Sequence, residues 1–153
     1  MESNLSAADY ESLAEFRYRI LKFLSFSEKA ARAAGLEPRQ HQLLLALKGL
    51  HKGIRPRVGE LAERLQIQHH SAVELVNRLA KAGYVKRQPS GIDRREVLIG
   101  LTPKGEKVLR ELSLHHKQEL RSAGPDLLAA LKRVIQADST PRHLRKGVEK
   151  GQA

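Results

Sequence analysis

A run of polar side chains between positions 68 and 78 offers the clearest chemistry in the sequence. Its members can bond to base edges or phosphates, and one apolar member can touch a thymine methyl group: Gln68, His69, His70, Ser71, Val73, Glu74, Asn77 and Arg78. Glutamine suits adenine, histidine can donate to guanine, and glutamate can accept from the amino group of cytosine. Glu74 could instead pair with Arg78, which we expect to contact phosphate or protein rather than a base. The pattern predicts a surface that reads double-stranded DNA.

A second group suited to DNA is the charged turn Asp93-Arg94-Arg95. Pro89 and Gly91 favour a tight turn just before it. An arginine at the tip of such a turn can enter a narrow minor groove, where the negative potential is strongest. We expect Asp93 to hold an arginine, either Arg78 or a neighbour, because a carboxylate has no reason to face phosphate. The alternative for Arg94 and Arg95 is an ordinary solvated turn.

Both groups need rigid support, and the apolar spacing predicts it. A helix over residues 69–82, ended by Gly83, is indicated by an inward face of Ala72, Leu75, Val76 and Leu79. A shorter helix is expected over residues 58–65, with a turn at Gln66 and Ile67. Strands are expected over residues 84–87 and 97–101, joined by the turn over residues 89–95. This order is that of a helix-turn-helix with a β-hairpin wing, whose second helix fits a major groove.

Longer helices are predicted on both sides of this unit. Ser6 can cap a first helix that Gly35 ends, and Pro38 begins the next helix. Thr102 and Pro103 begin a long helix. We expect that helix to break at Gly124-Pro125-Asp126, because proline lacks the amide hydrogen that a helix interior needs, and a last helix to carry Leu127, Leu128, Leu131, Val134 and Ile135.

The predicted fold is mainly α with a small β-hairpin wing. We expect a single domain over residues 1–137, made of a winged helix-turn-helix core over about 38–102 and dimerisation helices over about 6–34 and 103–137. Residues 138–153 are predicted to form a basic, disordered tail. The terminal helices carry apolar stripes that the small core cannot fully cover. We expect these stripes to pair with a second copy, which places two recognition helices about one DNA turn apart on a near-palindromic operator. The alternative is a monomeric bundle.

Charge and composition support a polyanionic partner. The chain has 153 residues and a formal net charge of +11 at pH 7. Basic residues gather in the loop before the helix-turn-helix, at Lys48, Lys52, Arg55 and Arg57, and again around the hairpin. Aromatic residues make up 4% of the chain, so stacking of bases on aromatic platforms is not expected. Charge alone leaves three alternatives open: a merely soluble basic surface, a non-specific architectural DNA-binding protein, and a winged module that contacts protein.

Other chemistry finds little support. The chain has no cysteine, which excludes disulfides and thiolate metal sites. No cofactor is expected, and only His41, His115 and His116 are candidates for a metal. Motifs for nucleophilic catalysis or nucleotide binding are absent, so we do not expect an enzyme. The polar N-terminus and the lack of a long apolar run predict neither a signal peptide nor a membrane span, in keeping with a cytoplasmic protein.

Four segments together resemble the MarR family, the multiple antibiotic resistance regulators. They are Leu61-Ala62-Glu63-Arg64-Leu65, the run from Asn77 to Val85, the wing Asp93-Arg94-Arg95, and Leu101-Thr102-Pro103-Lys104-Gly105. The resemblance implies a bacterial, homodimeric winged-helix transcription regulator, usually a repressor and often released by a small-molecule effector. Such an effector would bind between the long helices and the winged core. Gln66, His70, Ser71 and Glu74 depart from the common family pattern, which affects the operator to be expected but not the fold.

Overall fold

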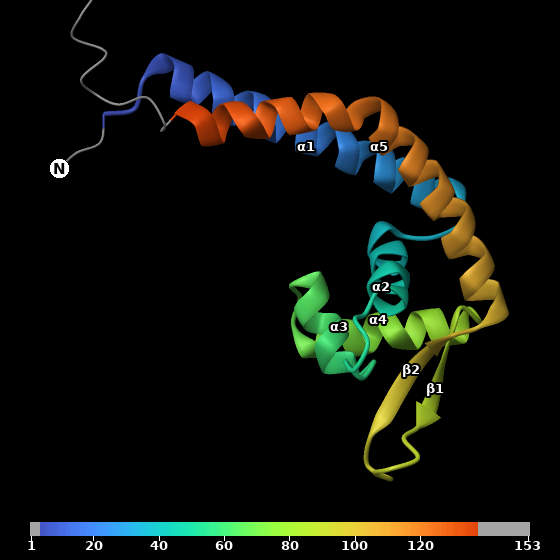
Figure 1. The fold of residues 1–153 in the computed structure, drawn as a ribbon. Helices are drawn as coiled ribbons and strands as arrows, with labels where there is room; N and C mark the ends of the chain where they lie inside the picture. The colour runs from blue at the N-terminus through green and yellow to red at the C-terminus, as the bar shows by residue number, and fades with distance from the viewer. Residues whose placement is uncertain (1–3, 138–153) are drawn as a thin grey trace, which may run out of the picture. The chain divides into compact units, whose positions relative to one another are not determined.

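The computed structural model describes residues 4–137, which form five helices and one two-stranded antiparallel sheet (Figure 1). In chain order the elements are α1 (Ala7–Ala33), α2 (Pro38–Lys48), α3 (Val58–Leu65), α4 (His69–Lys81), β1 (Val85–Pro89), β2 (Val97–Leu101) and α5 (Pro103–Ala137). The predicted fold class, mainly α with a β-hairpin wing, is confirmed. The tail predicted over residues 138–153 lies outside the described residues. Among residues 4–137, none of the helices combines the length and the hydrophobicity of a membrane span.

The chain divides into two compact units. The winged unit runs from Ser27 to Lys117 and holds α2, α3, α4 and both strands. Of the described residues, the helical unit combines those from 4 to 26 with those from 118 to 137, so it contains most of α1 and the second half of α5. The single domain over residues 1–137 and its internal boundaries stay predictions.

Local signals set most helix ends where the sequence predicts them. Ser6 caps α1 through a reciprocal pair of bonds: its hydroxyl accepts from the Asp9 amide at 3.2 Å, and its own amide donates to the Asp9 carboxylate at 2.7 Å. Gly83 has a φ of +82° and lets the chain leave α4 in the left-handed conformation. The Thr102 hydroxyl accepts from the Gly105 amide at 3.1 Å and so caps α5.

Gly105 is required by a close approach of two backbones. A Cβ atom at this position would lie 2.1 Å from the carbonyl oxygen of Tyr84. The amide of Thr102 donates to that same carbonyl at 3.1 Å. The first turn of α5 is therefore fastened to the start of the hairpin, and only glycine leaves room for it.

The predicted break at residues 124–126 is wrong, because α5 continues from Pro103 to Ala137 with Pro125 inside it. Proline removes one backbone hydrogen bond from a helix and favours a kink, yet its fixed φ is compatible with helix. Packed residues continue on both sides of the proline, since Ala123 and Leu127 are half-buried and Ala130 is buried. The packed face outweighs the lost bond, so the last two predicted helices are one.

The core of the winged unit fixes the orientation of α4. Ala72, Val76 and Leu79 are fully buried, as the helical spacing predicts, and the fourth predicted inward residue, Leu75, is half-buried. Val76 and Leu79 share one core cluster with Leu44 of α2 and Leu61 of α3. The hairpin pairs β1 with β2 from Val85 opposite Leu101 to Pro89 opposite Val97, so Pro89 ends the strand instead of opening the turn. Strand β2 also bonds to the loop before α3, because the Ile99 amide donates to the Pro56 carbonyl at 2.8 Å.

Candidate nucleic-acid interface

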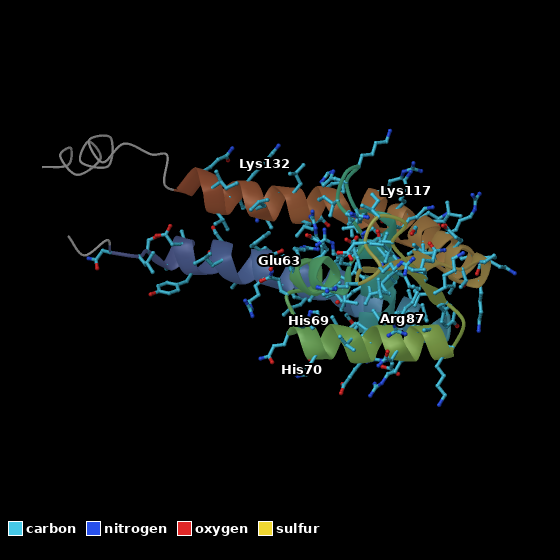
Figure 2. All side chains as sticks on the ribbon, turned by 90° about the horizontal axis from the view of Figure 1, so that it is seen from below. Glu63, His69, His70, Arg87, Lys117 and Lys132 are labelled. Atoms are coloured by element: carbon cyan, nitrogen blue, oxygen red, sulfur yellow. The ribbon has the colours of Figure 1, made fainter. Side chains whose placement is uncertain are left out.

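The outer face of α4 presents most of the polar residues singled out from the sequence. Six of them are exposed and two, Ser71 and Val73, are half-buried; the exposed ones are Gln68, His69, His70, Glu74, Asn77 and Arg78. Gln68 is the N-cap residue, so the histidines occupy the first turn and point away from the ribbon (Figure 2). Within residues 4–137, Glu74 and Arg78 form no ion pair with each other, so the alternative in which they pair is not found. Their charged ends are left to solvent.

Asn77 differs from the other residues on this face because it is held by the hairpin. The Arg87 guanidinium of β1 donates a hydrogen bond to its side-chain oxygen. Both residues are exposed, so the contact lies on the surface between helix and strand. It ties the second half of α4 to the wing. Arg87 was not among the residues predicted from the sequence, because nothing in the local pattern pairs it with α4.

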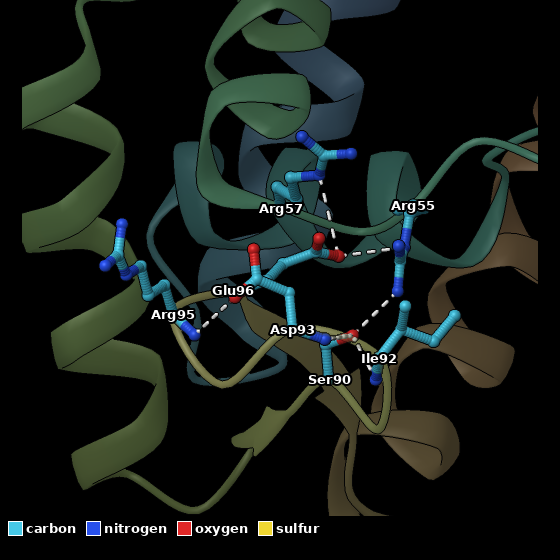
Figure 3. Close-up of polar contacts among 7 residues, drawn as sticks. All are labelled: Arg55, Arg57, Ser90, Ile92, Asp93, Arg95 and Glu96. Atoms are coloured by element: carbon cyan, nitrogen blue, oxygen red, sulfur yellow. Dashed lines mark hydrogen bonds and ion pairs between the residues drawn. The ribbon is translucent and has the colours of Figure 1, made fainter.

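The tip of the hairpin leaves two guanidinium groups in solvent. Arg94 and Arg95 are exposed, and neither side chain forms an ion pair with any residue between 4 and 137. The expectation that Asp93 holds an arginine side chain is wrong. Its carboxylate accepts instead from the main-chain amide of Arg95 at 2.9 Å (Figure 3). An aspartate readily bonds to the backbone two residues ahead, and this local turn satisfies the carboxylate without a guanidinium.

A group of four side chains joins the base of the hairpin to the loop before α3; we call it the wing-base cluster and define it as Arg55, Arg57, Ser90 and Glu96 (Figure 3). Nε of Arg55 lies 2.8 Å from Oε1 of Glu96, and Nε of Arg57 lies 3.7 Å from the same oxygen. Nη2 of Arg55 also donates to the Ser90 hydroxyl at 2.7 Å. The exposed fraction of the Glu96 side chain is 13%, against 33% for Arg55 and 55% for Arg57. The contact to Arg55 is an ion pair without an aligned hydrogen bond, because Oε1 accepts none.

The backbone of the turn uses the same cluster. The Ser90 hydroxyl accepts from the Ile92 amide at 3.2 Å, and the Ser90 amide donates to the Glu96 carbonyl at 2.9 Å. The basic loop is evident in the sequence, but Ser90 and Glu96 were not among the functional residues predicted from it. One signal in the sequence could have found Glu96: it is an acid directly after two arginines, in a segment otherwise suited to binding phosphate.

Two of the three metal candidates come together inside the winged unit. His41 is 3% exposed, and its ring lies 4.8 Å from that of His116, centroid to centroid. The His116 ring nitrogens lie 2.7 Å from the Leu112 carbonyl and 2.8 Å from the Ser27 hydroxyl. Burial lowers the pKa of His41, and the charge of His116 lowers it further. His115 is exposed, and the described part of the chain contains no group of three or more possible ligands suited to a metal ion.

Comparison with known proteins agrees with this geometry. The model of the MarR family matches residues 34–96. The regulator YcgE of Bacillus subtilis, an uncharacterised helix-turn-helix protein, is 32% identical over 114 residues, which cover 73% of this chain and 72% of YcgE. A shorter match, 38% identical over 56 residues, covers 35% of the length of YfiV from the same organism. The chain belongs to the MarR family.

Solved structures confirm the fold expected of a MarR protein. AbsC, a MarR-family regulator from Streptomyces coelicolor, superposes with a TM-score of 0.70 at 22% identity, over 93% of this chain and 97% of AbsC. A point mutant of Staphylococcus aureus MepR, bound to an oligodeoxyribonucleotide, gives a TM-score of 0.59 at 19% identity, over 88% of this chain and 99% of MepR. This MarR protein is a transcriptional regulator that binds DNA, and its relatives are regulators rather than enzymes.

Proposed function

We propose that the protein is a homodimeric repressor that recognises a near-palindromic operator in double-stranded DNA. The start of α4 enters the major groove, where His69, His70 and Glu74 face the base edges. Arg94 and Arg95 reach phosphates or the adjacent minor groove. One observation carries this proposal: the polar first turn of α4 and two unpaired arginines at the hairpin tip are exposed in the same compact unit.

The dimer is proposed from the apolar surface of the helical unit. Exposed apolar side chains lie on one face of each helix: Tyr10, Leu13, Leu21 and Leu24 on α1, and Leu120, Leu128, Leu131 and Ile135 on α5. The half-buried residues Phe16, Ile20 and Phe23 border this face of α1, so the apolar stripe is covered along one side only. A monomer would leave this apolar surface in water, and a contiguous exposed patch of this kind marks an interface.

Regulation by a small molecule is proposed from a groove in the winged unit. It has a volume of about 560 Å³ and lies between α2 and α5. Leu45 and Leu109 line it with apolar surface, and Lys107 and Arg110 add positive charge, whereas Lys48 is paired with Glu106 at 2.9 Å. Such a groove suits an anion with an apolar body. A panel of aromatic and aliphatic carboxylates should release DNA from the wild-type protein but not from Lys107→Ala; release of both alike would exclude this site.

The first test is a selection from random double-stranded DNA with purified protein at near-physiological salt. We expect an enriched near-palindrome with half-sites about ten base pairs apart. Binding without enrichment would favour a non-specific architectural protein that uses charge alone. No binding would refute the proposal. Transcription in vitro from a promoter that carries the selected motif then tests the sign, since a repressor lowers the yield and an activator raises it.

A matched pair of variants tests the proposed readers. Replacing His69 and His70 by alanine should change or abolish the selected motif, because these side chains lie in the first turn of α4. Replacing the exposed His51 and His115, which lie outside α4 and the hairpin, should leave the motif unchanged. A regulator of transcription that works in this way acts where the bacterial chromosome lies, in the cytoplasm.

A further inference from the structure

We propose that Glu96 is a positioning residue for DNA binding: it holds the wing in place through Arg55 and Arg57, and the protein binds DNA more tightly because of this acid. The inference rests on the proposed function, since it assumes that the wing contacts DNA. It concerns the wing-base cluster, whose members contact one another and not the outer face of α4.

The position of Glu96 makes this role unexpected. It follows Arg94 and Arg95 directly and stands beside Arg55 and Arg57, in a segment that faces phosphate in the proposed complex. A carboxylate in such a place repels the DNA backbone, and it also neutralises cations that could bind phosphate. Coulomb interactions alone therefore predict that removing the charge of Glu96 tightens DNA binding.

The contacts predict the opposite. Arg55 and Arg57 lie on either side of Pro56, whose carbonyl accepts the Ile99 amide at 2.8 Å. That bond and the two ion pairs of Glu96 join one edge of β2 to the loop before α3. Without the carboxylate, the backbone bond and the hydrogen bond from Arg55 to Ser90 would remain, beside two guanidinium groups that repel each other. A partly buried charge left without its partner is destabilising, so the loop would hold the hairpin less rigidly.

Ser90 connects the wing-base cluster to the turn at the tip of the hairpin. Its side chain is 6% exposed, and its hydroxyl accepts from Arg55 and from the Ile92 amide in the turn. Arg55 thus connects the loop to Glu96 at one end of the turn and to Ser90 at the other (Figure 3). The two arginines that are proposed to touch DNA lie between these anchored ends. Fixing them before DNA arrives lowers the entropy cost of binding.

The decisive experiment compares Glu96→Gln with Glu60→Gln, measuring affinity for a fluorescent fragment with the selected motif and for a shuffled fragment. Glu60 is an exposed acid of α3 outside the wing-base cluster, so its substitution removes the same charge and leaves that cluster intact. We expect Glu96→Gln to weaken binding to both fragments about five- to tenfold, equivalent to about 1–1.4 kcal/mol. We expect Glu60→Gln to bind equally well or slightly better.

Salt dependence and a neutral substitution separate positioning from charge. Loss of a wing phosphate contact should reduce the slope of log affinity against log salt by about one in Glu96→Gln. Ser90→Ala changes no charge, and it should weaken binding in the same direction. Hydrogen exchange of the free protein should show faster exchange of the Ser90 and Ile92 amides in both variants, while circular dichroism verifies that the helices remain.

The outcomes distinguish a failure of the proposed function from a failure of the positioning role of Glu96. If the wild-type protein binds no DNA, the proposed function is wrong, and hydrogen exchange alone then decides whether Glu96 orders the turn. If the wild type binds and Glu96→Gln binds as tightly or more tightly, the positioning role is overturned. Should Glu96→Gln fail to fold, Ser90→Ala decides: unchanged affinity with unchanged amide exchange would overturn the proposal.

Discussion

Arg94 stands at the tip of the hairpin with an exposed guanidinium that has no ion pair among the described residues. Substituting it by alanine should weaken binding to all DNA sequences, because a phosphate or minor-groove contact carries little base information. Filter binding or fluorescence anisotropy should show a salt slope reduced by about one. Arg133→Ala, which removes the same charge from α5, is the control and should have a smaller effect. Unchanged affinity in Arg94→Ala would remove the wing tip from the interface.

The buried residue His41 should make the stability of the winged unit depend on pH. Burial and the charge of His116 lower its pKa, so the folded chain binds this proton less readily than the unfolded chain does. Stability should therefore be fully present above the unfolded pKa of about 6.5 and decline as the pH falls below it toward the lower folded pKa. Urea unfolding between about pH 8 and pH 5 measures this decline. His41→Gln should flatten the profile, whereas substitution of the exposed His115 should not; equal profiles would contradict the role of His41.

At the scale of elements, we expect substitution of glycine by alanine to change the free energy of unfolding in opposite directions at two positions. Gly124 lies inside α5, and a Cβ atom there would meet nothing within 4 Å. Gly124→Ala should raise the free energy of unfolding by about 0.5–1 kcal/mol, because alanine loses less backbone entropy in a helix. Gly83→Ala should lower it by about 1–2 kcal/mol, because its φ of +82° is strained for any residue with a Cβ atom. Urea unfolding at one fixed protein concentration tests both. A destabilised Gly124→Ala would indicate a turn at residues 124–126.

Elements with strong local signals could be predicted from the sequence, and contacts between distant residues could not. Helix α4 was predictable because Ala72, Val76 and Leu79 repeat at helical spacing and Gly83 ends the helix. The continuity of α5 was not, because the cost of Pro125 is local whereas the packing that outweighs it depends on the whole helix. The exposure of the α4 face follows from periodicity. The pairing of Arg55 with Glu96 does not, because the loop and β2 meet only in the folded chain.

At the scale of the whole molecule, the apolar faces of the helical unit decide between monomer and dimer. In a two-fold symmetric dimer every substitution at the interface occurs twice, so one lysine in place of an apolar residue places two charges in or near the contact. Leu128 is an exposed residue of the α5 face. Leu128→Lys should therefore shift the protein toward monomer in sedimentation equilibrium. Ile92→Lys, an equally drastic change at an exposed apolar residue of the wing, should leave the association state unchanged.

Dissociation of the dimer should also lower the affinity for the palindrome, because its two half-sites are then no longer bound by joined subunits. Each winged unit of Leu128→Lys keeps its own α4 and hairpin, so affinity for a single half-site should stay near that of the wild type. Affinity for the complete palindrome should fall by at least about a hundredfold, because the second half-site no longer binds as an intramolecular event. A wild-type protein that sediments as a monomer would refute the dimer. A wild-type dimer that survives Leu128→Lys would place its interface on another surface, since a lysine ammonium desolvated in an apolar contact destabilises that contact in both copies.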